Sequence, residues 1–304
     1  MTKKHTTIIF AILTITVSTL ACSINFGDGT DQGGQPTQPP VVITHIAPDS
    51  PAGQPTEEAT DQPPRPTETP TPTLEPTPTS SLHSANYKGI SFSFDDAVAG
   101  GVMTEDIPAF PEGAGSPTGA LPEITRFNFI SYALQGTFHE PNIQVFSVSE
   151  YETMNEYAKQ VTDQLRNILV TRQTQVGSVL PLLPTWNAAQ FFAAQIHFLD
   201  FQNGSGVAYL SMYGQAAWPV NNESIFYTFQ GITSDGAWYI SAIFPVSHPL
   251  LPETGEVDDF ETFANNFEQH IEDMNRMLNE QDPSSFTPDL LLLDTLVETL
   301  SVKE

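Results

Sequence analysis

Residues 193–246 have the sequence AAQIHFLDFQNGSGVAYLSMYGQAAWPVNNESIFYTFQGITSDGAWYISAIFPV. The dipeptides Asn203-Gly204 and Asp235-Gly236 divide this stretch and are typical of tight hairpin turns, because glycine adopts positive φ at no steric cost. Alternating apolar residues flank both dipeptides. The pattern predicts four consecutive strands, at residues 194–202, 207–213, 224–232 and 237–245. Apolar side chains at both odd and even positions of the third strand indicate that the middle of the sheet is covered on both faces.

Further strands are expected on the N-terminal side of this stretch. In residues 87–95, Ile90, Phe92 and Phe94 alternate with serines, which is the two-residue period of a half-buried strand. A loop rich in proline and glycine should follow, and then two more strands. Their expected ranges are 107–122 for the loop and 124–134 and 143–148 for the strands.

Amphipathic helices are expected to pack on the sheet. The first would begin at Ser149 or Glu150 and the second would follow Pro252. Their apolar stripes consist of Met154, Tyr157, Ala158, Val161, Leu165, Ile168 and Leu169, and of Phe260, Phe263, Phe267, Ile271, Met274 and Leu278. A third helix, to about residue 300, would have Thr287 as its N-cap and Pro288 at its first position. The sequence thus predicts one α+β domain over residues 84–304, an antiparallel β-sheet packed by amphipathic helices.

The N-terminus has the pattern of a secretory signal. Lys3 and Lys4 precede an apolar run over residues 8–20, which is shorter than the roughly 20 residues that span a bilayer. Thr19-Leu20-Ala21-Cys22 resembles the lipobox of bacterial lipoproteins, with Thr19 and Leu20 where that family usually carries leucine and a small residue. The resemblance implies a lipoprotein signal peptide over residues 1–22 and lipidation of Cys22, the only cysteine. The alternative is a plain secretory signal with an incidental cysteine.

Residues 23–83 are expected to form a disordered linker. This segment holds 13 of the chain's 26 prolines, and Phe26 is its single aromatic residue, so it cannot bury a core. Its Pro/Thr repeats favour an extended polyproline conformation. The expected arrangement is a folded domain held outside the cytoplasm by a stalk and a lipid anchor on the bacterial membrane.

The acidic composition limits the classes of partner. The formal net charge is −26, which repels nucleic-acid phosphates and anionic lipid head groups. We therefore expect no nucleic-acid partner. The order of elements, from residues 87–94 to residues 293–300, resembles the Mog1/PsbP-like group. That resemblance implies an α/β/α sandwich and an accessory or binding role, and it transfers no functional residue.

No motif predicts catalysis or a cofactor. His197 and Asp200 would lie on opposite faces of a strand, and His139 with Glu140 supplies too few ligands for zinc. Gly204-Ser205-Gly206 lacks the spacing of a nucleophile elbow, and residues 113–119 lack that of a phosphate-binding loop. The sequence predicts neither a metal site nor a cofactor.

One group of aromatic and amide residues suits a sugar or an extended peptide, because rings stack on apolar faces while amides donate and accept hydrogen bonds. Its candidate ligand-binding members are Trp218, Tyr213, Asn221, Asn222, Gln230 and Trp238, with Gln202, Tyr227 and Tyr239 beside them. Large rings on strands also serve as core residues. Trp218, which precedes Pro219, is the member most expected to be exposed.

Three functions remain open from the sequence. The first is a non-enzymatic binding or accessory protein with an envelope glycan or a protein as partner. The second is a cell-envelope hydrolase of the glycosidase type, which needs two carboxylates about 5 to 9 Å apart; Asp200, Glu223 and Asp235 are its candidates. The third is a purely structural surface protein, for which no pocket is expected.

Overall fold

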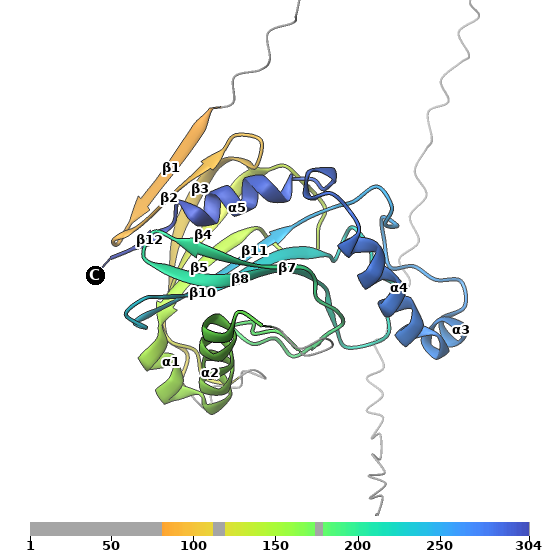
Figure 1. Cartoon of the computed structure of the whole chain (residues 1–304), viewed down its shortest axis with the longest axis horizontal. Helices are drawn as coiled ribbons and strands as arrows, with labels where there is room; N and C mark the ends of the chain where they lie inside the picture. The colour runs from red at the N-terminus through yellow and green to blue at the C-terminus, as the bar shows by residue number, and fades with distance from the viewer. Residues whose placement is uncertain (1–80, 112–118, 174–178, 304) are drawn as a thin grey trace, which may run out of the picture. The chain divides into compact units, whose positions relative to one another are not determined.

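The computed structural model describes residues 81–111, 119–173 and 179–303 (Figure 1). The expected signal peptide, Cys22 and nearly all of the expected linker therefore lie outside the described residues. The strands are β1 (Leu82–Tyr87), β2 (Ile90–Asp95), β3 (Ala99–Ile107), β4 (Ile124–Tyr132), β5 (Asn142–Ser147), β6 (Ala189–Gln190), β7 (Ala194–Phe201), β8 (Gly204–Ser211), β9 (Tyr213–Gly214), β10 (Phe226–Thr233), β11 (Trp238–Pro245) and β12 (Ser301–Val302). The α-helices are α1 (Val148–Met154), α2 (Glu156–Thr171), α3 (Phe260–Asn265), α4 (Phe267–Asn279) and α5 (Leu290–Glu298). The α+β prediction is confirmed.

A seven-stranded antiparallel sheet in the order β3-β4-β5-β11-β10-β8-β7 forms the centre of the fold. The four predicted strands of residues 193–246 supply β7, β8, β10 and β11. Every residue of β10 is buried, so the prediction of a sheet covered on both faces is confirmed in the middle of the sheet.

One of the two predicted turns is confirmed and the other is displaced. Gly236 has a φ of 73° in the turn between β10 and β11, and its N–H donates to the carbonyl of Thr233 at 2.8 Å. In the other hairpin, Phe201 pairs with Gly204, so the turn consists of Gln202 and Asn203. Gly204 belongs to β8, where it pairs with Phe201 and Thr233. A side chain at this position would collide with the Phe201 ring and the Ile232 carbonyl oxygen, so the strand requires glycine here.

The first predicted strand is in fact a hairpin. Lys88 and Gly89 both have positive φ and form a two-residue turn, so only residues 90–95 of the predicted range form β2. β1 begins at Leu82, and His83 therefore lies in a strand rather than in the linker. The pattern also missed β3, whose sequence has two glycines after Ala99 and exposed acidic residues near its end.

The two faces of the central sheet have different covers (Figure 1). Phenylalanines from β2, β4 and β11 pack together on one face, where Phe129 lies 5.0 Å from Phe244 between ring centroids. The small β1-β2-β12 sheet and α5 belong to the same core cluster. α1 and α2 bury Tyr151, Val161 and Leu165 on the opposite face. Helices thus lie on both faces, although membership of the Mog1/PsbP-like group stays a prediction.

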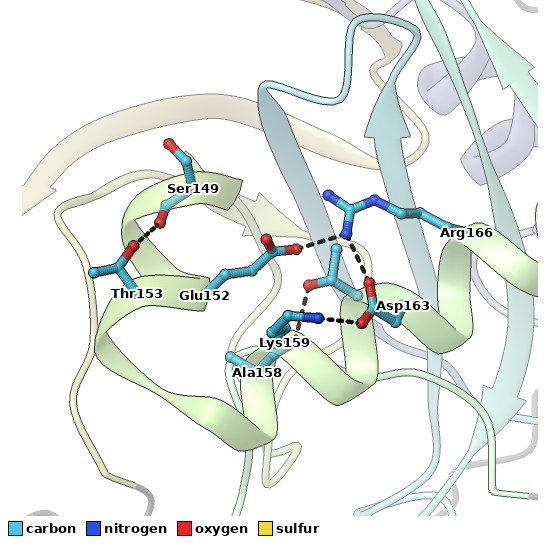
Figure 2. A network of polar contacts seen from close by, with 8 residues as sticks. Ser149, Glu152, Thr153, Ala158, Lys159, Asp163 and Arg166 are labelled. Atoms are coloured by element: carbon cyan, nitrogen blue, oxygen red, sulfur yellow. Dashed lines mark hydrogen bonds and ion pairs between the residues drawn. The ribbon is translucent and has the colours of Figure 1, made fainter.

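Each of the first two predicted helices is interrupted by an asparagine. Asn155 ends α1 and caps α2, because its Oδ1 accepts from the backbone N–H groups of Tyr157 and Ala158 at 3.1 Å. Figure 2 shows Arg166 of α2 joining Glu152 of α1, at 2.7 Å, to Asp163, at 3.0 Å. Asn266 separates α3 from α4 differently, because its side chain does not cap α4 and its Nδ2 donates back to the Thr262 carbonyl of α3 at 2.8 Å.

The third helix starts later than predicted. Asp289 is its N-cap and accepts from the N–H of Leu291 at 2.9 Å, so Thr287 and Pro288 precede the cap. No helix among the described residues has the length and apolar character needed to cross a membrane.

Candidate functional site: a pocket on the sheet face

A pocket of about 1080 Å³ lies on the α1/α2 side of the central sheet. This volume is at the upper end of the range for small-molecule sites. Side chains of β4, β5 and β11 form its floor, namely Arg126, Asn142, Gln144 and Ile243. Arg126 pairs in register with Gln144, so the two share one face of the sheet. Loops at residues 138–140, 186–188, 212–224 and 254–256 supply most of the walls.

Aromatic rings packed around Trp186 form one wall of the pocket. His139 stacks on Trp186 with ring centroids 4.7 Å apart and an interplanar angle of 13°. Tyr213 and Phe226 meet the same indole at 5.2 and 5.3 Å. Phe138, which is 73% exposed, meets His139 edge-on at 5.0 Å. The wall therefore offers apolar ring surface to a ligand while its inner rings hold one another in place.

Burial shifts the pKa values of two rings of this wall away from neutral pH. Desolvation lowers the pKa of His139 from its ordinary value of 6.5 to about 4. The pKa of the Tyr213 phenol is raised, also chiefly by desolvation. Both rings are consequently neutral parts of the pocket.

Trp218 lies in the pocket lining and is 45% exposed, as the sequence predicted for its position before Pro219. Its ring centroid is 5.7 Å from that of Phe260 at the start of α3. The backbone just after Trp218 is hydrogen-bonded to α4, because the N–H of Val220 donates to Nε2 of His270 at 3.1 Å. Trp218 is thus an exposed ring on a loop whose backbone is anchored.

Asn221 and Asn222 are buried and shape the loop that carries Trp218. Asn221 Nδ2 donates to the Pro219 carbonyl at 2.8 Å, and its Oδ1 accepts from the N–H of Ser224 at 3.0 Å. Asn222 Oδ1 accepts from the N–H of His248 at 2.9 Å. Of the two, Asn221 lines the pocket. Their amides are engaged with the backbone, so these residues position the site.

The other sequence candidates do not join this pocket. Gln230 is fully buried and bonds Leu183, Thr228, Tyr239 and Ser241. Trp238 lines a separate cavity of about 290 Å³. Tyr227 donates to Asp294, Tyr239 donates to Gln230, and Gln202 occupies the β7–β8 turn. Gln230, Tyr227 and Tyr239 are buried in the core, which is the alternative interpretation that the sequence left open.

The acidic candidates for hydrolysis are not brought together in the pocket. Asp200 forms an ion pair with Arg172 at 2.8 Å, and Asp235 accepts from the N–H of Ala237 in a hairpin turn. Glu223 alone of the three lines the pocket. Glu140 and Glu256 join it there, and Arg126 is the only lysine or arginine among the described lining residues. The pocket lining is therefore acidic in balance.

The histidine of β7 has a partner that sequence spacing did not reveal. His197 Nε2 lies 3.0 Å from Asp294 Oδ1, and Tyr227 donates to the same oxygen at 2.8 Å. Burial lowers the pKa of His197, but the hydrogen bond and charge of Asp294 outweigh it and raise the pKa overall. No group of three or more His, Cys, Asp or Glu side chains in the described part of the chain is placed to hold a metal ion.

Sequence reasoning missed Trp186, Arg126 and Gln144. Trp186 lies in a segment without periodicity, so nothing marked it as part of a wall. Polar residues recur at alternate positions of two strands, as Arg126 and Asn128 in β4 and as Asn142 and Gln144 in β5. Such polar alternation within otherwise buried strands is the signal that could have indicated a polar floor.

Comparisons with known protein families and with curated proteins give no match for this chain. The site is therefore interpreted from its geometry and chemistry.

Proposed function

We propose that this protein is a non-enzymatic binding protein of the bacterial cell surface, lipidated at Cys22, and that its pocket binds a neutral glycan. One observation carries the glycan assignment. The pocket joins a wall of aromatic rings to a floor of amide and guanidinium groups, which is the combination that sugar rings need for stacking and hydrogen bonding. Of the lining rings, Phe138 and Trp218 are exposed.

The place of the pocket in the sheet favours a glycan over an extended peptide. Peptides that add a strand require a sheet edge with free backbone groups. The floor of the pocket includes β5 and β11, and each of these strands is paired on both sides. A ligand on this floor meets side chains, and ring stacking with side-chain hydrogen bonds suits sugars.

The charge of the pocket favours a neutral ligand. Glu140, Glu223 and Glu256 line it, and their carboxylates repel acidic sugars and phosphates. Carboxylates also accept hydrogen bonds from hydroxyl groups, so they are compatible with neutral sugars. A pocket of this size also counts against the purely structural role, for which no pocket was expected.

A binding screen tests the proposal. The full chain is titrated with soluble oligomers of glucose, mannose, galactose and N-acetylglucosamine, with an oligomer of a uronic acid as the charged comparison. We expect a neutral oligomer to bind and the uronic acid oligomer not to bind. A ligand at 100 times its Kd adds about 2.7 kcal/mol to the free energy of unfolding, which thermal denaturation detects.

Replacing Trp218 with alanine should weaken that binding about tenfold, because loss of a stacking ring costs about 1.4 kcal/mol or more. Tyr157→Ala is the matched control, since Tyr157 is 57% exposed on α2 and does not line the pocket. Calorimetric titration of both variants measures the effect. Equal loss of affinity in both variants would contradict the assignment of the pocket.

The anchor has its own test in cells. Cys22→Ser removes the thiol that would carry the lipid, so the chain should leave the membrane fraction on cell fractionation. Continued retention of the Cys22→Ser variant in that fraction would argue against lipidation at this residue.

The hydrolase is a second candidate because Glu140, Glu223 and Glu256 line the same pocket. A glycosidase would use two such carboxylates about 5 to 9 Å apart. Prolonged incubation with the oligomer that binds distinguishes the two functions. Shortened products that disappear with Glu223→Gln would favour the hydrolase, and an unchanged oligomer would favour binding alone.

A further inference from the structure

The helices α3 and α4 form an arm (residues 260–279) that is lightly packed on the rest of the domain. No residue of α3 is buried, and α4 buries only Leu278, near its C-terminal end. The chain enters this arm just after residues 254–256, which line the pocket. The position of the arm therefore affects the position of one pocket wall.

Two contacts join this arm to the loop that carries Trp218. The ring of Phe260, the first residue of α3, lies 5.7 Å from the Trp218 ring between centroids. Nε2 of His270 in α4 accepts a hydrogen bond from the backbone N–H of Val220 at 3.1 Å. One aromatic contact and one histidine thus hold the arm beside an exposed ring of the pocket.

The hydrogen bond determines the protonation state of His270. A backbone N–H can only donate, so Nε2 offers its lone pair and the ring is neutral, with its proton on Nδ1. A second proton, on Nε2, would place two donors against each other. Because Val220 is fully buried, losing this bond would leave its N–H buried without an acceptor.

The surroundings of His270 keep the ring neutral at neutral pH. Burial lowers its pKa from the ordinary value of 6.5, and the charge of Asp273 on the same helix opposes this shift without cancelling it. Phe263 of α3 meets the ring edge-on at 5.1 Å. The acids of the neighbouring segments, Glu256 and Glu261, do not shift this pKa, and residues 218–220 carry no charged side chain. His270 therefore takes up a proton only in mildly acidic solution.

We propose that His270 makes ligand binding by the pocket depend on pH. Neutral His270 holds the arm against the loop of Trp218, and the pocket binds its glycan. A proton on Nε2 breaks the bond to Val220, and the lightly packed arm moves because Val220 is fixed in the core. That movement displaces residues 254–256 and the Phe260 ring, so affinity falls in acid. This inference rests on the proposed function of the pocket and adds its regulation.

The first test follows the loop without any ligand. In the full chain labelled with ¹⁵N-valine, NMR measures the protection factor of the Val220 amide, which is the intrinsic exchange rate at each pH divided by the observed rate. It should fall about fivefold or more between pH 7.5 and pH 5.0. His270→Gln retains an acceptor in Oε1 and does not titrate, so its factor should stay constant. His83→Gln is the matched control, because His83 lies on β1 and outside the pocket.

The second test measures affinity at the same two pH values by calorimetric titration. The probes are soluble oligomers of glucose, mannose, galactose and N-acetylglucosamine. At least one should bind the natural protein about fivefold more weakly at pH 5.0 than at pH 7.5. His270→Gln should bind it equally at both, and His270→Phe, which has no acceptor, should bind it weakly at both. His139 in the pocket wall stays largely neutral at pH 5.0, because its pKa is about 4.

The two tests separate failure of this inference from failure of the glycan proposal. An unchanged protection factor of Val220 in the natural protein would overturn the inference. So would a His270→Gln variant that loses as much affinity in acid as the natural protein does. Either result would leave the neutral-glycan function standing. If none of the oligomers binds at pH 7.5, both the glycan function and its regulation by His270 are overturned.

Discussion

Replacing Gln230 with methionine should lower the free energy of unfolding by about 3 to 5 kcal/mol. Gln230 is fully buried, and its Oε1 accepts from the N–H of Leu183 at 3.0 Å and from the Tyr239 hydroxyl at 2.9 Å. Methionine has similar length and no strong acceptor, so both donors would be left buried without a partner. Each such group costs about 1 to 3 kcal/mol.

Denaturant unfolding measures this loss as a fall in the midpoint at constant slope. Gln202→Met is the matched control, because Gln202 is exposed in the β7–β8 turn. Its Nε2 donates to the Glu298 carbonyl at 2.8 Å, and loss of this exposed bond should cost no more than about 1 kcal/mol. An equally small loss of stability in Gln230→Met and in the control would mean that water reaches the N–H of Leu183 and the hydroxyl of Tyr239. That result would contradict the burial of Gln230 in a closely packed core.

The free energy of unfolding of the His139→Phe variant, minus that of the natural protein, should increase as the pH is lowered from 8 to 5. The pKa of His139 is about 4 in the folded chain and near 6.5 when unfolded, so between these values the unfolded chain binds the extra proton. His139 therefore lowers stability as pH falls through this window. The relative gain of the variant should reach about 2 kcal/mol at pH 5.

Phenylalanine keeps a flat ring against Trp186 and does not titrate, which isolates the protonation of His139. Urea unfolding at pH 8, 6.5 and 5 gives the comparison before most carboxylates titrate. His197 acts in the opposite direction, since its pKa is raised in the folded chain and its contribution is lost as pH rises, but it is common to both proteins. A difference that does not vary with pH would contradict the burial of a neutral His139.

The sheet could be predicted from sequence because its signals are local. Alternating apolar residues and glycine turns marked the strands of residues 193–246, and only the Asn203-Gly204 hairpin was displaced by one residue. The helix breaks were not predictable from periodicity, because the apolar stripes continue through Asn155 and Asn266. At these two positions the side-chain and backbone hydrogen bonds of asparagine end one helix before the next begins, although the apolar periodicity continues.

The candidate site was only partly predictable. Trp218 could be singled out because it precedes a proline in an expected loop, so its ring was not expected to pack in the core as part of a strand. Gln144 and Arg126 become neighbours only through the register of β4 with β5, and Trp186 reaches His139 across a long sequence separation. These contacts depend on the assembled sheet, and no short-range pattern in the chain specifies them.

The β1-β2 hairpin determines how the domain responds to tension from its N-terminal side. Leu82 pairs with Asp95 at the open end of the hairpin, so a pull on the chain before Leu82 breaks the ladder one residue pair at a time. β1 contributes no fully buried residue, whereas β2 is also held by β12 and packs against α5. Peeling β1 would release roughly 20 Å of chain while the pocket and the main core stay intact. Under tension from the N-terminal side, β1 should therefore detach before the rest of the domain unfolds.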